Sequence, residues 1–137
     1  MGGVAGYLKR VRTPPDYPRW EAAGLRWLAE VPDGARVVDV LSVSDGALEL
    51  EFLTATTPTR AAAGDLGVGL ARTHAAGAPG YGAPPAGWSG DGYLGPASQP
   101  LPLPLRPTDS WGVFWAEQRL LPLVERFRGS GHIVRFI

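Results

Sequence analysis

The clearest pattern of hydrophobic and polar positions runs from Leu48 to Leu53, where leucine and phenylalanine alternate with glutamate in the order Leu-Glu-Leu-Glu-Phe-Leu. A period of two is typical of a half-buried antiparallel strand. The segment 36–43 is apolar and β-branched, and Ser-Asp-Gly at 44–46 supplies the positive φ that a tight turn needs. We therefore predict a hairpin of two strands, 36–43 and 47–53.

The spacing of apolar residues predicts a helix upstream of the hairpin, from about Asp16 to about Glu30. Asp16 is suited to cap the helix, and a proline follows it in the first turn. Glu21, Leu25 and Leu28 are spaced at i, i+4 and i+7, so they share one face of the helix. The pattern therefore predicts that the Glu21 carboxylate lies on the apolar face of the helix, which packs against the rest of the fold.

Residues 7–11, Tyr-Leu-Lys-Arg-Val, favour a short strand before this helix. Alternation along the strand places Lys9 on the same face as Tyr7 and Val11. The order strand, helix and hairpin indicates a small antiparallel sheet with one packed helix. The predicted fold class is α+β.

The second half of the chain predicts two helices that a long loop separates. Thr59 can cap a helix that ends at about Ala76. Between residues 77 and 107, fifteen of thirty-one positions are glycine or proline, which predicts a loop without regular structure. A last helix is expected over 109–128, with a kink at Pro122.

A change of composition marks a possible domain boundary after the hairpin. The polar connector Thr-Ala-Thr-Thr-Pro-Thr follows Leu53 directly. We therefore expect a hinge near residue 54, with one part of the chain over 1–54 and a second part over 55–137.

Charge and composition narrow the possible partners. The formal net charge is zero and no basic block occurs, so the chain lacks the electrostatic footprint of a nucleic-acid-binding protein. The absence of cysteine excludes disulfides and thiolate metal sites. No apolar run is long enough for a signal peptide or a membrane span. We expect a soluble cytoplasmic protein with neither nucleic acid nor membrane as a partner.

The thirteen basic residues comprise twelve arginines and a single lysine, Lys9. Glu21 follows it on the inward face of the next helix. In kinases, a strand lysine beside the nucleotide phosphates is held by a helix glutamate. A solvated surface lysine and a glutamate favoured by the helix dipole would give the same spacing. From the residues alone, both interpretations stay open.

Two further features also allow more than one interpretation. The strand end at 48–53 runs into a connector, as the strand before an adenine-binding hinge does in a two-lobed kinase, but an ordinary strand end would look the same. His74 lies on an apolar helix face without a partner histidine or cysteine, so we interpret it as structural.

Taken in order, six segments resemble the fructosamine kinase (ketosamine-3-kinase) family, which is related to aminoglycoside and choline kinases and has a protein-kinase-like fold. The matching segments are Gly-Tyr-Leu-Lys at 6–9, Glu-Ala-Ala-Gly-Leu-Arg-Trp-Leu-Ala at 21–29, Leu-Glu-Leu-Glu-Phe-Leu at 48–53, Leu-Gly-Val-Gly-Leu-Ala-Arg-Thr-His at 66–74, Gly-Tyr-Leu-Gly at 92–95, and the stretch from Trp111 to Pro122. Together they span nearly the whole chain.

The resemblance implies ATP-dependent phosphorylation of a sugar hydroxyl on a ketoamine, the glycation adduct of an amine or a protein lysine, as a repair step. It implies that Lys9 contacts the ATP phosphates and that Glu21 holds Lys9. It also implies that backbone groups of Glu51 and Leu53 meet the adenine. The loop 93–99 would border the sugar site.

The resemblance further implies an incomplete nucleotide-binding small lobe with its hinge over 1–54 and the start of a mainly helical large lobe over 55–137. The His-Gly-Asp-Leu catalytic loop and the later metal-binding aspartate of the family do not occur in this sequence. The glycine-rich strand pair before the lysine is also absent, and the tail after Arg128 looks unlike the family.

These departures lead to three expectations about the chain as it stands. Phosphoryl transfer by this chain alone is not expected, and Mg²⁺ would be bound by residues that it lacks. A non-catalytic nucleotide-binding or protein-interaction domain derived from the kinase fold is the alternative. Helix faces at 60–76 and 109–128 would be left uncovered, which predicts self-association or partial disorder.

Overall fold

The computed structural model of the chain describes residues 5–128, where short antiparallel strands and helices form an α+β fold, as predicted. Contacts divide these residues into two compact units. The first unit holds residues 5–77, 85–88 and 95–100, and the second holds residues 78–84, 89–94 and 101–128.

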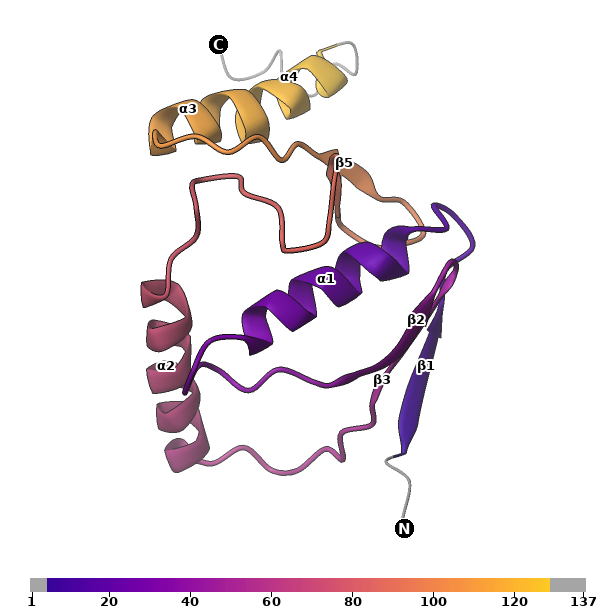
Figure 1. Cartoon of the computed structure of the whole chain (residues 1–137), viewed down its shortest axis with the longest axis vertical. Helices are drawn as coiled ribbons and strands as arrows, with labels where there is room; N and C mark the ends of the chain where they lie inside the picture. The colour runs from indigo at the N-terminus through magenta and orange to yellow at the C-terminus, as the bar shows by residue number, and fades with distance from the viewer. Residues whose placement is uncertain (1–4, 129–137) are drawn as a thin grey trace. The chain divides into compact units, whose positions relative to one another are not determined.

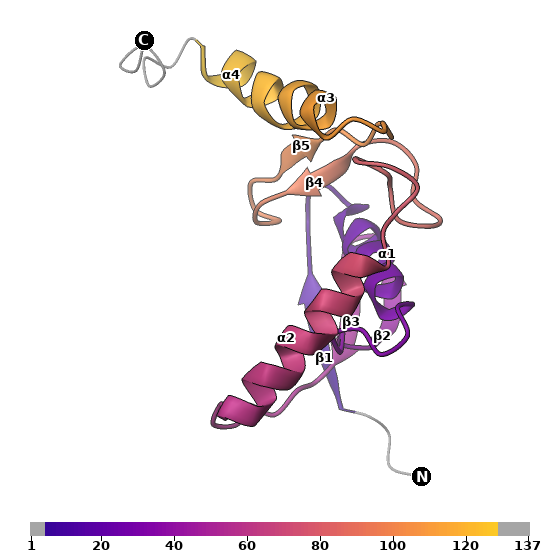
Figure 2. The ribbon, with the colours of Figure 1, turned by 90° about the vertical axis from the view of Figure 1, so that its left-hand side faces the viewer.

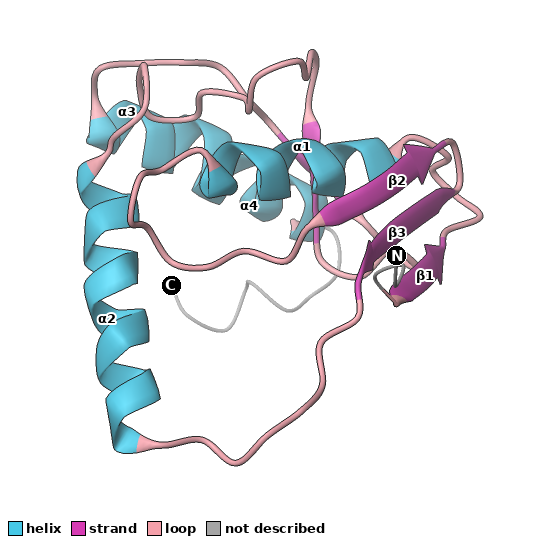
Figure 3. Ribbon diagram, turned by 60° about the horizontal axis from the view of Figure 1, so that its bottom comes forward, coloured by secondary structure: helices cyan, strands magenta, loops and turns pink. Residues whose placement is uncertain are grey.

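The first unit is built on a three-stranded antiparallel sheet in the order β1-β3-β2 (Figure 3). Its strands are β1 (Gly6–Arg10), β2 (Val40–Ser44) and β3 (Ala47–Glu51). The predicted hairpin is therefore present, with Gly46 at φ +75° in its turn. In the register of β1 and β3, Lys9 lies opposite Leu48.

The first strand of the hairpin is shorter than the sequence predicts. We expected a strand over 36–43, but regular pairing begins only at Val40, and the register shifts between Val40 and Ser42. Before the strand, the Asp39 carbonyl accepts the Glu51 N–H at 2.9 Å, and Arg36 binds the Glu51 side chain. Contacts with Glu51 thus hold segment 36–39 in place of the ladder of hydrogen bonds that a regular strand would form.

Helix α1 (Tyr17–Ala29) packs against this sheet (Figure 1). The proline lies in the first turn, as predicted. Asp16 occupies the cap position, but its side chain does not make the capping bond, and its carbonyl accepts the N–H groups of Arg19 and Trp20 instead. Val11, Ala22 and Leu48 are buried at this contact and form the core of the unit.

Helix α2 (Arg60–Ala75) begins where the sequence predicts, because the Thr59 hydroxyl accepts the Ala62 N–H at 3.1 Å. The segment before β2 approaches this helix closely. A side chain added at Gly69 would come within 2.9 Å of the Ala35 backbone, and the Ala35 N–H donates to the Thr73 hydroxyl at 3.0 Å. Glycine at 69 therefore permits the contact.

These contacts place α2 in the same unit as the sheet. The proposed division into lobes at residue 54 concerns how the chain divides by function, so it stays a prediction.

The second unit contains a short two-stranded sheet and a long interrupted helix (Figure 2). Its elements are β4 (Gly92–Leu94), β5 (Leu101–Leu103), α3 (Trp111–Trp115), the π-helical turn η1 (Ala116–Leu120) and α4 (Leu121–Phe127). The prediction of no regular structure over 77–107 was therefore wrong. Three-residue strands can form despite the prolines, because Pro102 needs no donor at the edge of so short a ladder.

The expected effect of Pro122 takes the form of a π-helical turn directly before it. Proline has no N–H to donate to the carbonyl four residues earlier, which belongs to Gln118. That carbonyl accepts Nη1 of Arg119 at 2.9 Å instead. The buried Gln118 side chain also binds the Arg106 N–H at 2.8 Å and the Arg106 carbonyl at 2.6 Å, which ties the helix to the loop.

The core of the first unit can be tested at Leu48. We expect Leu48→Ala to lower the free energy of unfolding by about 2–5 kcal/mol, because the side chain is fully buried. Urea unfolding followed by tryptophan fluorescence measures this loss. Leu8→Ala, on the neighbouring strand and half exposed, is the control, with an expected change of about 0.5 kcal/mol. Equal losses in the two variants would contradict this core.

Candidate functional site

A lysine and a glutamate from two different elements of the first unit meet in an ion pair. Lys9 lies on β1 and Glu21 on α1, and Nζ of the lysine donates to Oε2 of the glutamate at 2.6 Å. Their side chains are 32% and 27% exposed. The pair that the sequence suggested is therefore formed, and it is partly screened from solvent.

The surrounding elements hold this pair in place from both sides. Lys9 follows the sheet register opposite the buried Leu48, so its direction is set by the ladder. Tyr17 and Glu21 are four residues apart and share one face of α1. The lysine Nζ lies 5.5 Å from the centre of the Tyr17 ring, in cation–π geometry.

The energies of the ion pair and of the cation–π contact indicate that they orient the Lys9 side chain and add little to the stability of the fold. A partly exposed ion pair contributes at most about 1 kcal/mol to stability, and an exposed cation–π contact about 0.5–1 kcal/mol. Such energies do not decide whether the unit folds. They do restrict a flexible side chain to one direction, and an ammonium group that gives one N–H to Glu21 keeps two donors for another acceptor.

Tyr17 is a residue of this site that the sequence reasoning missed. Its side chain is buried, and its hydroxyl donates to the Gly95 carbonyl at 2.9 Å. The loop at 95–100 is thereby attached to α1 beside the lysine. The four-residue spacing from Tyr17 to Glu21 was a signal that could have identified it.

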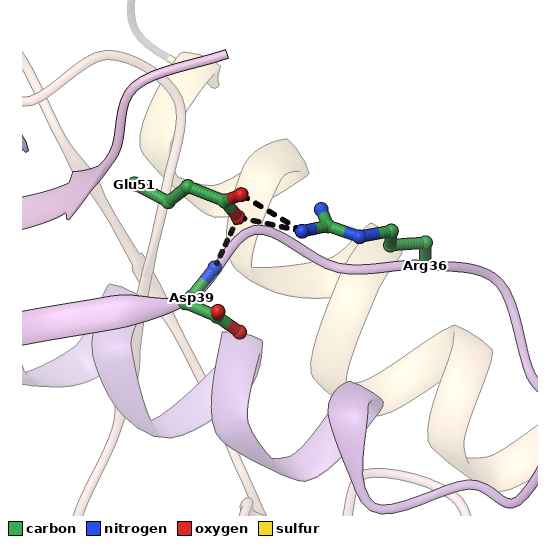
Figure 4. A network of polar contacts seen from close by, with 3 residues as sticks. All are labelled: Arg36, Asp39 and Glu51. Carbon is green, nitrogen blue, oxygen red and sulfur yellow. Dashed lines mark hydrogen bonds and ion pairs between the residues drawn. The ribbon is translucent and has the colours of Figure 1, made fainter. Parts of the chain in front are cut away.

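Glu51 has a different environment, which is drawn in Figure 4. Nη2 of Arg36 donates to both of its carboxylate oxygens, at 2.8 and 2.9 Å, and the Asp39 N–H approaches at 3.4 Å. The hydrogen bonds from Arg36 lower the pKa of the Glu51 carboxyl below its ordinary 4.5, and the Asp39 N–H adds to this effect. The Glu51 side chain is therefore an anion that ties segment 36–39 to the sheet.

The structure does not bring all four predicted site residues together. Glu51 pairs with Gly6 in the ladder, three residues along from the pair of Lys9 and Leu48. Its N–H is already bonded to the Asp39 carbonyl. Leu53 lies beyond the end of β3 with 54% of its surface exposed. The suggested contacts of Glu51 and Leu53 with adenine stay a prediction.

The described residues contain neither a cluster of metal ligands nor a membrane-spanning helix. Between residues 5 and 128, no three histidine, cysteine, aspartate or glutamate side chains gather closely enough to hold a metal ion. Within the same part of the chain, no helix is both long and apolar enough to cross a membrane.

Comparison with known proteins gives two findings. The family model described as "Fructosamine kinase" matches residues 16–135. Among solved structures, a "putative fructosamine-3-kinase" from Thermobifida fusca YX-ER1 superposes with a TM-score of 0.78 at 34% identity, over 94% of this chain and 43% of that one. This chain thus spans less than half the length of that protein. No curated protein matches.

The pair of Arg36 and Glu51 generates a prediction about pH. A carboxylate with a lowered pKa in the folded state stabilises the fold above its ordinary pKa, and this contribution is lost as the pH falls through the lowered value. We expect Arg36→Gln to be less stable than the wild type above about pH 4.5, the ordinary pKa of Glu51, and the difference to shrink as the pH falls from there through the lowered pKa. Urea unfolding across this range measures the difference.

The exposed Arg26 on α1 provides the matched control, because no carboxylate partner of it is recorded in the described residues. The stability difference between Arg26→Gln and the wild type should not vary with pH in this way. A difference for Arg36→Gln that stays constant through the acidic range would contradict the assigned pair.

Proposed function

The chain belongs to the fructosamine kinase family, and from this premise we propose that its part in the family's function is to bind the phosphates of ATP through Lys9. The match covers most of the chain by the family model, and the fold matches that of a solved relative. These two matches support membership of the family and the general class of kinase. The individual roles of the residues are our proposal.

One observation carries this proposal, the bond of 2.6 Å between Lys9 and Glu21. In kinases, a strand lysine contacts the phosphates while a helix glutamate holds its ammonium group. Here the lysine lies on a strand, the glutamate on the packed helix, and two ammonium donors remain for phosphate oxygens. The residues present therefore fit the triphosphate end of ATP.

For the adenine end, we propose the backbone after β3. The N–H of Glu51 is engaged with Asp39, so any contact of Glu51 with adenine would run through its carbonyl oxygen. Leu53 would supply a second backbone group and an exposed apolar side chain against the ring. In this proposal residues 1–54 form an incomplete nucleotide-binding lobe with its hinge, and residues 55–137 begin a helical lobe.

The substrate and the complete reaction are also proposals. The family name suggests a ketoamine whose sugar hydroxyl accepts the phosphoryl group, a deglycation reaction that we place in the cytoplasm. This sequence has no His-Gly-Asp-Leu segment to supply a catalytic base and metal ligands. We therefore propose that the chain, as given, binds nucleotide without transferring phosphate, and that Mg²⁺ would be held by residues outside it.

Self-association is a further part of the proposal, because apolar helix surface is uncovered. On α2, Leu66 and Leu70 share a face and are 53% and 40% exposed. Leu120 and Leu121 in the last helix are 47% and 49% exposed. Apolar patches of this kind are typical of surfaces that another polypeptide covers. In this proposal, a second copy of the chain covers them.

Binding of ATP by Lys9 can be tested directly by calorimetry. We expect Lys9→Met to weaken ATP binding roughly ten- to a hundredfold, because it removes charge-assisted hydrogen bonds worth about 1.5–3 kcal/mol. We expect its unfolding free energy to change by no more than about 1–2 kcal/mol, because the ion pair and the ring contact are weak.

Glu21→Gln separates positioning from contact. Glutamine keeps a hydrogen-bond acceptor for Lys9 but loses the charge, so we expect a smaller loss of ATP affinity than in Lys9→Met. Arg60→Gln, at the exposed start of α2, is the control and should bind as the wild type does. Absence of ATP binding by the wild type, or equal binding by Lys9→Met, would refute the proposal. A non-catalytic interaction domain would then be favoured.

Self-association is tested by sedimentation velocity over a range of protein concentrations. We expect the sedimentation coefficient to rise with concentration, and Leu66→Glu to reduce this rise by placing a charge in the apolar face. Ala61→Glu introduces the same charge on nearly the opposite side of α2 and should leave the rise unchanged. A wild type that stays monomeric throughout would rule out self-association.

A further inference from the structure

The first unit contains a pocket that does not include the pair of Lys9 and Glu21. The pocket has a volume of about 380 Å³, within the range of small-molecule sites. It is lined by Arg10, Val11, Arg12, Thr13, Ala97 and Ser98. Two walls thus meet, one from the end of β1 and one from the loop at 95–100.

The wall at the end of β1 is held by the backbone of the hairpin turn. The Val11 N–H donates to the Gly46 carbonyl at 2.8 Å, and the Gly46 N–H donates to the Pro15 carbonyl at 2.7 Å. Val11 itself is buried in the core, with 5% of its surface exposed. The segment that carries both arginines is therefore fixed on either side of the buried valine.

The wall from the loop is held by a turn and by a tyrosine. The Gln99 N–H donates to the Pro96 carbonyl at 2.9 Å, which closes a turn around Ala97 and Ser98. Gly95 has φ +88°, a conformation that favours glycine, and its carbonyl accepts the hydroxyl of the buried Tyr17 at 2.9 Å. Ala97 and Ser98 are thereby held in a defined turn that lines the pocket.

The charge in this pocket is uncompensated within the described residues. Arg10, at the end of β1, and Arg12, two residues further along the chain, both line this pocket. Among residues 5–128, neither arginine forms an ion pair, whereas Arg19 binds Asp45 and Arg36 binds Glu51. Two arginines therefore line one small pocket to which no aspartate or glutamate contributes.

We propose that this pocket binds a small molecule through a phosphate monoester group. A phosphate monoester carries about two negative charges and three acceptor oxygens, which match two guanidinium groups and the hydroxyls of Thr13 and Ser98. Arginine is suited to this role because its planar fork donates two parallel hydrogen bonds to phosphate. The remaining volume accommodates the organic part of the molecule. The proposal does not depend on nucleotide binding at Lys9.

The test is a titration of the full chain with glucose 6-phosphate, with glucose and acetate as the neutral and the carboxylate comparison. We expect saturable binding of glucose 6-phosphate, and shifts of the Ala97 and Ser98 amide signals in ¹⁵N spectra. The double variant Arg10→Gln/Arg12→Gln should bind at least about tenfold more weakly, because each arginine contributes charge-assisted bonds. Arg60→Gln, elsewhere in the first unit, should bind as the wild type does.

Several results would overturn this proposal. They are no saturable binding of glucose 6-phosphate, equal binding of glucose, or unchanged affinity in the double variant. Tighter binding of acetate than of glucose 6-phosphate would also overturn it, since the pocket would then be a carboxylate site. The ¹⁵N spectrum of the double variant establishes whether it remains folded. Should it unfold, Ser98→Ala takes its place, with a smaller expected loss of affinity and the same refuting result.

Discussion

The direction of the Lys9 side chain depends on how α1 packs against the three-stranded sheet. Leu48 and Ala22 are fully buried where the helix meets the sheet, and this contact sets the distance between β1 and the helix. Burial of a leucine is worth about 1.5–3 kcal/mol, more than the partly exposed ion pair beside it. The apolar contact thus supplies the stability, and the bond from Lys9 to Glu21 uses the position that results.

Elsewhere in the first unit, apolar burial again supplies stability, and polar groups again depend on the positions that it fixes. Tyr17 contributes an apolar ring to the core and uses its hydroxyl to hold Gly95, which defines the loop opposite Arg10 and Arg12. One buried tyrosine therefore supports both polar sites, with its ring near Lys9 and its hydroxyl at the loop. In contrast, the interaction of Glu51 with segment 36–39 lies at the end of the central strand β3, and it depends on pH because the pKa of Glu51 is lowered.

The sequence predicted those features that depend on local periodicity. Alternation around Leu48 identified the hairpin. The spacing of Glu21 on its helix, with Lys9 on a strand, made the pair a candidate, and the family resemblance favoured it. The family and the α+β fold class are also confirmed. These features could be predicted because each one repeats along a single element or follows directly from the face that a residue occupies.

The features that sequence reasoning missed depend on contacts between distant segments. Segment 36–39 has the composition of a strand, but its partners are the side chain and N–H of Glu51. The hairpin of β4 and β5 forms in a region rich in glycine and proline, where no local period indicates a strand. The bond from Tyr17 to Gly95 joins residues 78 positions apart in the sequence. Composition and spacing carry no information about such partners.

The central claim is that the Lys9 ammonium, oriented by Glu21, contacts the phosphates of ATP. Because Lys9 is the only lysine, selective ¹⁵N-lysine labelling gives a single side-chain ammonium signal that can be followed directly. The account predicts that this signal shifts saturably when ATP is added and stays in place with adenosine, which has no phosphates. An ammonium signal that does not move at ATP concentrations that saturate the protein, or that moves equally with adenosine, would contradict it.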